Sequence, residues 1–240
     1  MKPWKVILIP AVITLLIGGI YLAIVFHNRA KEAVATNKAP EQQLTADEVA
    51  IDRQEFPAHF DDVAELAGKS VWMRNGFSMP YYAYTGSHVN WAKQIGLLPP
   101  AQRLDVKKAI KAAAPASISN KVPHGDHQAL VVFTLPGDSN EYALAVGAME
   151  GQQEQYFDDI LFFYDDPHTI YAHWPKETWA AIDAHQPKQG MNELQVSLAL
   201  GMNFQTDSQD KGNRTVIYDV NGKKTTVTFA NDKATTIQPQ

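Results

Sequence analysis

The residues best suited to chemistry lie in three short polar stretches. His124-Gly-Asp126-His127 precedes an apolar segment, and Asp158-Asp159 and Asp165-Asp166-Pro-His168 come later in the chain. Imidazoles and carboxylates from the ends of neighbouring strands could converge on one divalent metal ion, with a water molecule in its open position. Turns select the same residue types without any ligand. We therefore assign no catalytic, cofactor-binding or metal-ligating residue, and a metal-dependent envelope hydrolase that uses His124, His127 and nearby carboxylates is the alternative hypothesis.

Other catalytic patterns do not occur in the sequence. Cysteine is missing, which excludes disulfides, thiolate metal sites, cysteine nucleophiles and cysteine-linked lipid anchors. No G-x-S-x-G, H-E-x-x-H, EF-hand or G-x-G-x-x-G pattern is present. By elimination we expect a protein that is not an enzyme and needs no cofactor.

The longest apolar segment is an uncharged run of 21 residues from Val6 to Phe26. As a helix with about 1.5 Å rise per residue it reaches about 30 Å, the thickness of the bilayer hydrocarbon layer. A cleaved signal peptide has the same basic start, here Lys2 and Lys5, but a shorter apolar core. We therefore predict an uncleaved single-pass anchor over residues 1–26, with the lipid bilayer as its partner. A cleaved signal and a peripheral helix are the alternatives.

Charge bounds the location and the partners of the rest of the chain. Lys2 and Lys5 precede the apolar run and Arg29 and Lys31 follow it, so the charge bias that orients a membrane helix is slight. A short N-terminal tail, however, is easily kept in the cytoplasm. The remainder is therefore expected to be extracytoplasmic. The net charge is −5 for the whole chain and −7 after Phe26, which disfavours nucleic acid and anionic lipid surfaces as partners.

Residues 27–65 are expected to form a polar spacer followed by short helices. The first part is rich in alanine, glutamine and charged residues and poor in large apolar ones. Thr45-Ala-Asp-Glu48 matches a capping box and predicts a helix start. A second helical stretch through Val63 and Leu66 should end at Gly68.

Residues 66–172 are expected to form a β-rich antiparallel domain. The pattern predicts strands at residues 70–74, 81–84, 128–135, 141–149 and 155–164. Turn-rich connections of five residues join the last three, which suits a meander. Pro99-Pro100 before an alanine- and lysine-rich stretch favours a helix over residues 101–114, although Leu104 and Val106 would also suit a strand.

Residues 173–240 are expected to form two helices and a three-stranded antiparallel sheet. Pro175 suits the first turn of one helix, Asn192 and Gln195 form a capping box for the next, and Gly201 should end it. Strands are predicted at residues 214–220, 223–229 and 234–238, joined by the turns Asn221-Gly222 and Asn231-Asp232.

A family resemblance rests on the second helix of this module. Gly190-Met-Asn-Glu-Leu-Gln-Val-Ser-Leu-Ala-Leu-Gly201 resembles the G-M-T-x-x-Q-V-x-x-x-L-G signature of the SmpA/OmlA (BamE-like) family, and residues 215–229 fall where that family has its hairpin. This chain has Met202-Asn-Phe204 where the family usually has a proline, and an apolar run where its members typically have a lipidated cysteine. The resemblance implies a non-catalytic accessory of envelope assembly.

The sequence thus predicts an α+β protein with a single N-terminal transmembrane helix, a β-rich antiparallel middle domain and a C-terminal module of two helices and three strands. The predicted function is that of a membrane-anchored, extracytoplasmic binding or scaffold protein of the cell envelope, with another envelope protein as partner. Many aromatic residues should fill the core. A loop around Phe77 and Tyr81 is the candidate contact surface, and burial of both within their own domain would contradict that suggestion.

Overall fold

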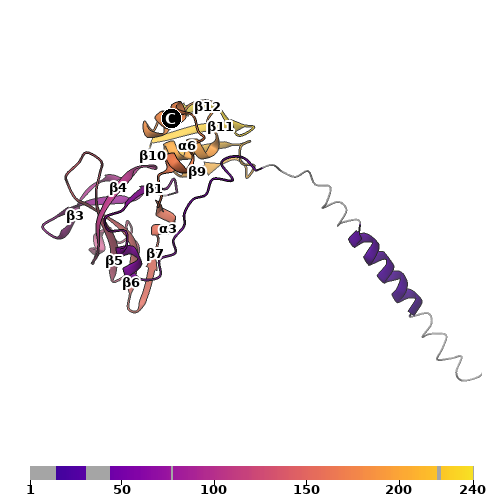
Figure 1. Cartoon of the computed structure of the whole chain (residues 1–240), viewed down its shortest axis with the longest axis horizontal. Coiled ribbons are helices and arrows are strands. Elements are labelled where there is room, and N and C mark those ends of the chain that lie inside the picture. Colours follow the sequence, from indigo (N-terminus) through magenta and orange to yellow (C-terminus); the bar gives the residue numbers. More distant parts are fainter. Residues whose placement is uncertain (1–14, 31–43, 77, 221–222, 240) are drawn as a thin grey trace, which may run out of the picture. The chain divides into compact units, whose positions relative to one another are not determined.

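The computed structural model describes residues 15–30, 44–76, 78–220 and 223–239, which fall into two units, residues 1–48 and 49–240. Residues 15–30 form a helix, drawn in indigo in Figure 1. Of the predicted span Val6–Phe26, residues 6–14 lie outside the described residues. Within the described ranges no helix is both long and apolar enough to cross a membrane.

The larger unit contains a large antiparallel sheet and a second, four-stranded sheet. The elements up to the second sheet are α2 (Phe60–Ala64), β1 (Ser70–Met73), β2 (Pro80–Thr85), β3 (His88–Leu97), β4 (Arg103–Ala112), the 3₁₀ turn η1 (Ala116–Ile118), β5 (His127–Thr134), β6 (Tyr142–Glu150), β7 (Gln153–Tyr156), α3 (Asp158–Leu161), β8 (Phe162–Phe163) and α4 (Pro167–Ile170). They are followed by α5 (Lys176–Asp183), α6 (Glu193–Leu200), β9 (Asn203–Thr206), β10 (Thr215–Val220), β11 (Lys223–Ala230) and β12 (Lys233–Pro239). The α+β class is confirmed.

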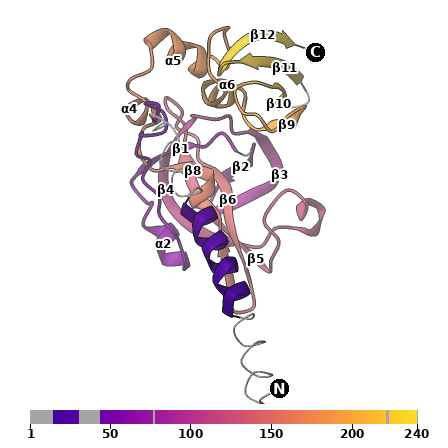
Figure 2. The same ribbon diagram turned by 90° about the vertical axis from the view of Figure 1, so that its right-hand side faces the viewer.

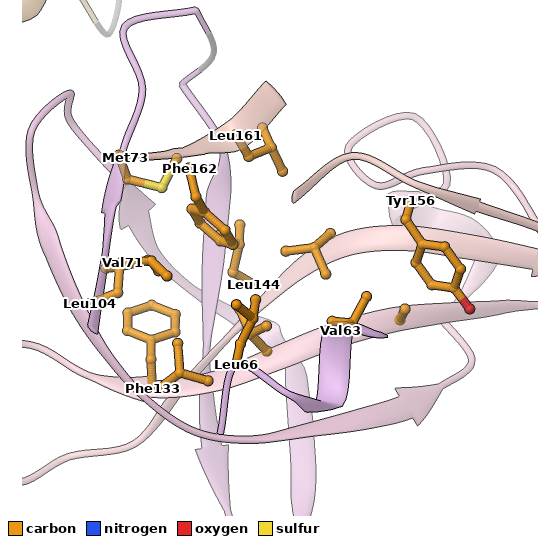
Figure 3. Close-up of a cluster of buried hydrophobic side chains, with 14 of the residues drawn as sticks. Val63, Leu66, Val71, Met73, Leu104, Phe133, Leu144, Tyr156, Leu161 and Phe162 are labelled. Atoms are coloured by element: carbon orange, nitrogen blue, oxygen red, sulfur yellow. The ribbon is translucent and has the colours of Figure 1, made fainter. Parts of the chain in front are cut away.

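The large sheet has the strand order β3-β2-β6-β5-β4-β1-β8, with β7 added beside β6. The central strands β5 and β6 are buried on both faces, because alternate side chains of each enter different apolar clusters. Figure 3 shows the larger cluster, in which Val63 and Leu66 from the α2 region meet Leu104 of β4 and Phe133 of β5. The predicted hairpin of residues 128–135 and 141–149 is confirmed by the β5 and β6 ladder.

The strands β1 and β8 contribute to two different cores. Trp72 pairs with Phe163 and Met73 pairs with Phe162, and Figure 2 shows the two strands side by side. Because side chains alternate along a strand, Met73 and Phe162 enter the core of the large sheet, whereas Phe163 and Trp72 pack into the core of the C-terminal module.

The C-terminal module follows most of its predicted pattern. Asn192 caps α6 by accepting from the backbone N–H of Gln195, whose side chain accepts in return, both at 2.9 Å. Gly201 ends the helix with φ 96°, and the predicted turn at Asn231 and Asp232 has φ values of 50° and 55°. Residues 221–222 lie outside the described residues. The sheet has four strands in the order β12-β11-β10-β9 rather than three, because β9 adds to the edge of β10.

Two predicted elements of the middle region are wrong. The helix expected over residues 101–114 is strand β4, in which Leu104 and Val106 are buried and pairing with β1 and β5 outweighs the helix propensity of alanine and lysine. The strand expected over residues 155–164 is divided into β7, α3 and β8. The chain has to leave β6 and continue beside β1, three strands away, and the single turn of α3 redirects it.

One local expectation needs correction, and one strand was missed. The capping box of Thr45 and Glu48 forms, with the backbone N–H of Thr45 donating to Glu48 Oε2 at 2.7 Å, but it closes only one turn. The neighbouring Val49 and Ile51 are exposed, so no packing supports a longer helix. The strand β3 was not anticipated, because its residues alternate weakly and Trp91 lies in a bulge opposite β2.

Candidate functional site

The residues of the predicted metal site do not come together. His127 begins β5 opposite Met149 of β6, whereas Asp158 follows Phe157, whose N–H donates to the carbonyl of Val146 on the same strand. Met149 lies three positions after Val146 along the strand, which is roughly 10 Å at about 3.3 Å per residue. In the described part of the chain no three histidine, aspartate or glutamate side chains could hold one metal ion.

Asp126 and His168 of that set have partners nearby. Asp126 accepts from the backbone N–H of Gly151 at 3.1 Å. His168 lies between two carboxylates, with Nδ1 2.8 Å from Asp166 and Nε2 3.2 Å from Asp183, and its ring stacks on Trp179. An imidazole whose two nitrogens both contact carboxylates joins the start of α4 to the end of α5, and this arrangement serves the structure of the module.

Asp158 is a buried carboxyl group at the start of α3. Its residue is 2% exposed, Oδ2 accepts from the hydroxyl of Tyr164 at 3.1 Å, and Oδ1 has no partner among the described residues. Burial raises the pKa of the Asp158 carboxyl to about 6. Burial and the adjacent carboxylate of Asp158 also raise the pKa of the Tyr164 hydroxyl. Asp158 and Tyr164 thus form a buried pair in which the pKa values of both the carboxyl and the phenol are raised.

Residues 49–59 form an extended segment without regular secondary structure, which we call the strap. Asp52 of the strap pairs with Arg74, the residue after β1. Arg74 also donates from Nε to the carbonyl of Phe162 at 2.7 Å. Its guanidinium carbon lies 4.5 Å from the ring centroid of Phe163. One arginine therefore ties the strap to β8 and to the end of β1.

The next residue of the strap, Arg53, makes a second set of contacts with the domain. Arg53 donates from Nη2 to the carbonyl of Tyr164 at 3.1 Å. It also lies 3.7 Å from a carboxylate oxygen of Glu55 and 3.7 Å from one of Asp165, two longer and partly exposed contacts. The strap is thus held to the domain by polar contacts of two adjacent residues, Asp52 and Arg53.

The burial pattern of the strap is inverted. The side chain of Asp52 is 15% exposed, and its Oδ1 is buried with no hydrogen-bond partner among the described residues. The apolar residues Ile51 and Phe56 are 89% and 79% exposed. Folded proteins ordinarily bury apolar side chains in preference to carboxylates. The outward face of the strap is therefore an exposed apolar surface over a largely buried carboxylate.

A hollow of about 290 Å³ adjoins this face. Residues of the strap, of the turn after β1 and of α3 line it: Gln54, Phe56, Arg74, Asn75, Gly76, Asp159 and Ile160. Ile160 is 45% exposed and adds a second apolar side chain to the rim. The Asn75 amide donates to the hydroxyl of Ser197 at 2.6 Å, so the turn is tied to α6. The hollow has a fixed wall and an exposed apolar rim.

The sequence indicated only part of this site. The aromatic loop supplies Asn75 and Gly76 to the hollow, while Tyr81 is half-buried against Phe133 and Tyr142, and Phe77 lies outside the described residues. The roles of Ile51 and Phe56 were missed. The available signal was two large apolar residues in a polar segment close to Pro57, without a helical or alternating period.

Most aromatic residues serve as core, as expected. Those buried in the larger unit include Tyr82, Tyr84, Tyr156, Phe162, Phe163, Tyr164, Tyr171, Trp174 and Trp179. The BamE-like resemblance of residues 190–201 remains a prediction. Comparison with protein-family models, with curated proteins and with solved structures gave no match for this chain.

Proposed function

We propose that this chain is a membrane-anchored, non-catalytic binding or scaffold protein of the cell envelope, with its folded unit outside the cytoplasm. The observation that carries the proposal is the helix of residues 15–30, whose large apolar side chains are exposed on all sides: Leu15, Leu16, Ile17, Ile20, Tyr21, Leu22, Ile24 and Phe26. A helix that is apolar all round needs a non-aqueous environment. In the sequence it belongs to the uncharged run from Val6, whose length matches a bilayer.

The folded unit supports the binding half of the proposal. An exposed apolar face beside a fixed hollow is the kind of surface that proteins use to hold a partner. The resemblance of residues 190–201 to the BamE-like signature points to the same class, an accessory in envelope assembly. The charge of −7 after Phe26 argues for a protein partner rather than nucleic acid.

The anchor is tested by extraction of cell membranes with alkaline carbonate. The full chain should remain in the pellet. A double variant, Ile17→Lys with Ile20→Lys, should be released, because each lysine near the middle of a membrane helix costs about 2.5–3.5 kcal/mol of insertion free energy. Phe204→Lys, at an exposed phenylalanine of β9, is the matched control and should stay with the membrane. Release of the unchanged protein by carbonate would refute the anchor.

Orientation and partner need separate measurements. Protease added outside intact cells or spheroplasts should remove the folded unit, whereas full protection would place it in the cytoplasm. Crosslinking in intact membranes, followed by purification and mass spectrometry, should capture an envelope protein. Crosslinked species that consist of lipid or nucleic acid alone would contradict a role in protein binding.

A further inference from the structure

We propose that the hollow and the outward face of the strap form a docking site for a segment of a partner protein in which lysine or arginine side chains stand next to apolar ones. The inference deepens the proposed function, and it rests on that function for the statement that a protein partner exists. It concerns the chemistry of the partner, which the strap and the hollow determine together.

The inverted strap supplies the apolar part of the docking site. Ile51 and Phe56 could lie inward only if the strap turned over, and the Asp52–Arg74 pair together with the Arg53 hydrogen bond to Tyr164 prevents that. Both apolar side chains are thereby held in water by polar contacts elsewhere. Burying each under a partner would recover the apolar surface that folding leaves exposed. A fixed aromatic side chain such as Phe56 is a typical anchor of protein interfaces.

The charged residues around the hollow select a basic partner. Asp52 compensates Arg74, and among the residues that the structure describes a single cation, Arg53, faces both Glu55 and Asp165. Asp159, on the wall of the hollow, accepts from the backbone N–H of Ile160 at 2.9 Å and has no basic partner within 4 Å in the described part of the chain. The surroundings of the hollow therefore carry an excess of negative charge. A basic partner gains from this field, and an acidic one is repelled.

A bilayer surface fits the same site less well. The anionic headgroups of cell membranes would face Asp159 and the unbalanced carboxylates around Arg53, which opposes contact. The hollow is also bounded by the turn at Asn75, whose bond to Ser197 fixes it, so the site has a shape that a side chain can enter. These two features favour a peptide segment over lipid.

The test uses the full chain in a nonionic detergent and isothermal titration calorimetry. The probe is a short synthetic peptide of leucine and lysine separated by glycine and serine, and the comparison peptide has glutamate in place of lysine. Titration of each peptide into detergent alone gives the background. The lysine peptide should bind with a dissociation constant below about 1 mM, and rising salt should weaken it. The glutamate peptide should not bind.

Three variants identify the site. Phe56→Ser and Ile51→Ser should each weaken the lysine peptide about tenfold, the loss typical of an interface anchor. Asp159→Asn should weaken it about two- to fivefold and reduce its salt dependence. Phe204→Ser, at another exposed phenylalanine on β9, is the matched control and should bind as the unchanged chain does. All four side chains altered are at least partly exposed, so thermal unfolding should confirm that each variant folds.

Several outcomes would overturn the inference. These are no saturable binding of the lysine peptide, equal binding of both peptides, or full affinity in Phe56→Ser. Displacement of the bound peptide by phosphatidylcholine vesicles would assign the site to lipid instead. If carbonate does not extract the chain but the lysine peptide does not bind, the docking site is refuted and the membrane anchor stands. If carbonate releases the chain but the lysine peptide binds, the membrane anchor is refuted and the docking site stands.

Discussion

Replacing Asp158 by asparagine should stabilise the protein at neutral pH. The carboxyl is 2% exposed and has one hydrogen bond, from Tyr164, and its pKa is raised to about 6 from 3.8 by burial. A raised pKa means that the native state disfavours the ionised form. The stability contributed by the neutral form is fully present below pH 3.8 and is lost as the pH rises through about 6.

The size of the effect follows from those two values. The two pKa values differ by about two units. At 1.36 kcal/mol per unit, the ionised carboxylate lowers the free energy of unfolding by about 3 kcal/mol at pH 7.5. At pH 4.5 the native group is mostly neutral while the unfolded one is mostly ionised, so the cost falls to about 1 kcal/mol. Asparagine resembles the neutral acid in shape. The free energy of unfolding of Asp158→Asn should therefore exceed that of the unchanged chain by up to about 3 kcal/mol at pH 7.5 and by about 1 kcal/mol at pH 4.5.

The measurement is urea unfolding of the full chain in mild detergent, followed by tryptophan fluorescence at both pH values. The quantity of interest is the difference between variant and unchanged protein, since other carboxylates change the stability of both equally. Asp159→Asn, on the neighbouring and less buried residue, is the control and should show a much smaller difference. A difference that does not depend on pH, or a less stable Asp158→Asn at pH 7.5, would show that the native state holds this carboxylate in its ionised form.

Three further substitutions test other parts of the structure by the same unfolding assay. Tyr82→Phe should leave stability unchanged or raise it by up to about 1 kcal/mol, because the Tyr82 hydroxyl is fully buried with no partner among the described residues; a loss above about 1 kcal/mol would contradict this. Gly147→Ala should cost about 1–3 kcal/mol, because the added Cβ would lie 2.5 Å from the carbonyl oxygen of Gln155 on β7, and a neutral result would mean that β7 moves freely. Glu193→Ala should cost about 3–5 kcal/mol, because it leaves the guanidinium of Arg214, 7% exposed, without its carboxylate; a cost below about 1 kcal/mol would show that the pair is not a structural anchor.

Short-range patterns predicted the parts of the fold that depend on neighbouring residues. The hairpin of β5 and β6, the Asn192 capping box and the end of α6 at Gly201 all formed as expected. The errors lie where distant segments decide. Residues 103–112 form a strand because β1 and β5 lie on either side, and the local strand signal of Leu104 and Val106 was weaker than the helix propensity of the surrounding alanines and lysines.

The candidate site was harder to predict for the same reason. The histidines and aspartates that suggested a metal site are of the residue types that bind metals. Different strands position them, and their types alone do not show whether these strands bring them together. The strap lies beside β8 because Asp52 meets Arg74 and Arg53 meets Tyr164, a residue 111 positions later in the chain. Contacts of this range leave no periodic trace in the sequence, so the inversion of Ile51 and Phe56 can only be observed in three dimensions.

The sharing of β1 and β8 between two cores determines how the larger unit should melt. Separating β1 from β8 removes Met73 and Phe162 from one core and Trp72 and Phe163 from the other in a single event. Neither sheet can lose its packing at this ladder without loosening the other. The two sheets should therefore unfold together in one cooperative transition, and a cavity made in either core should lower the melting temperature of both.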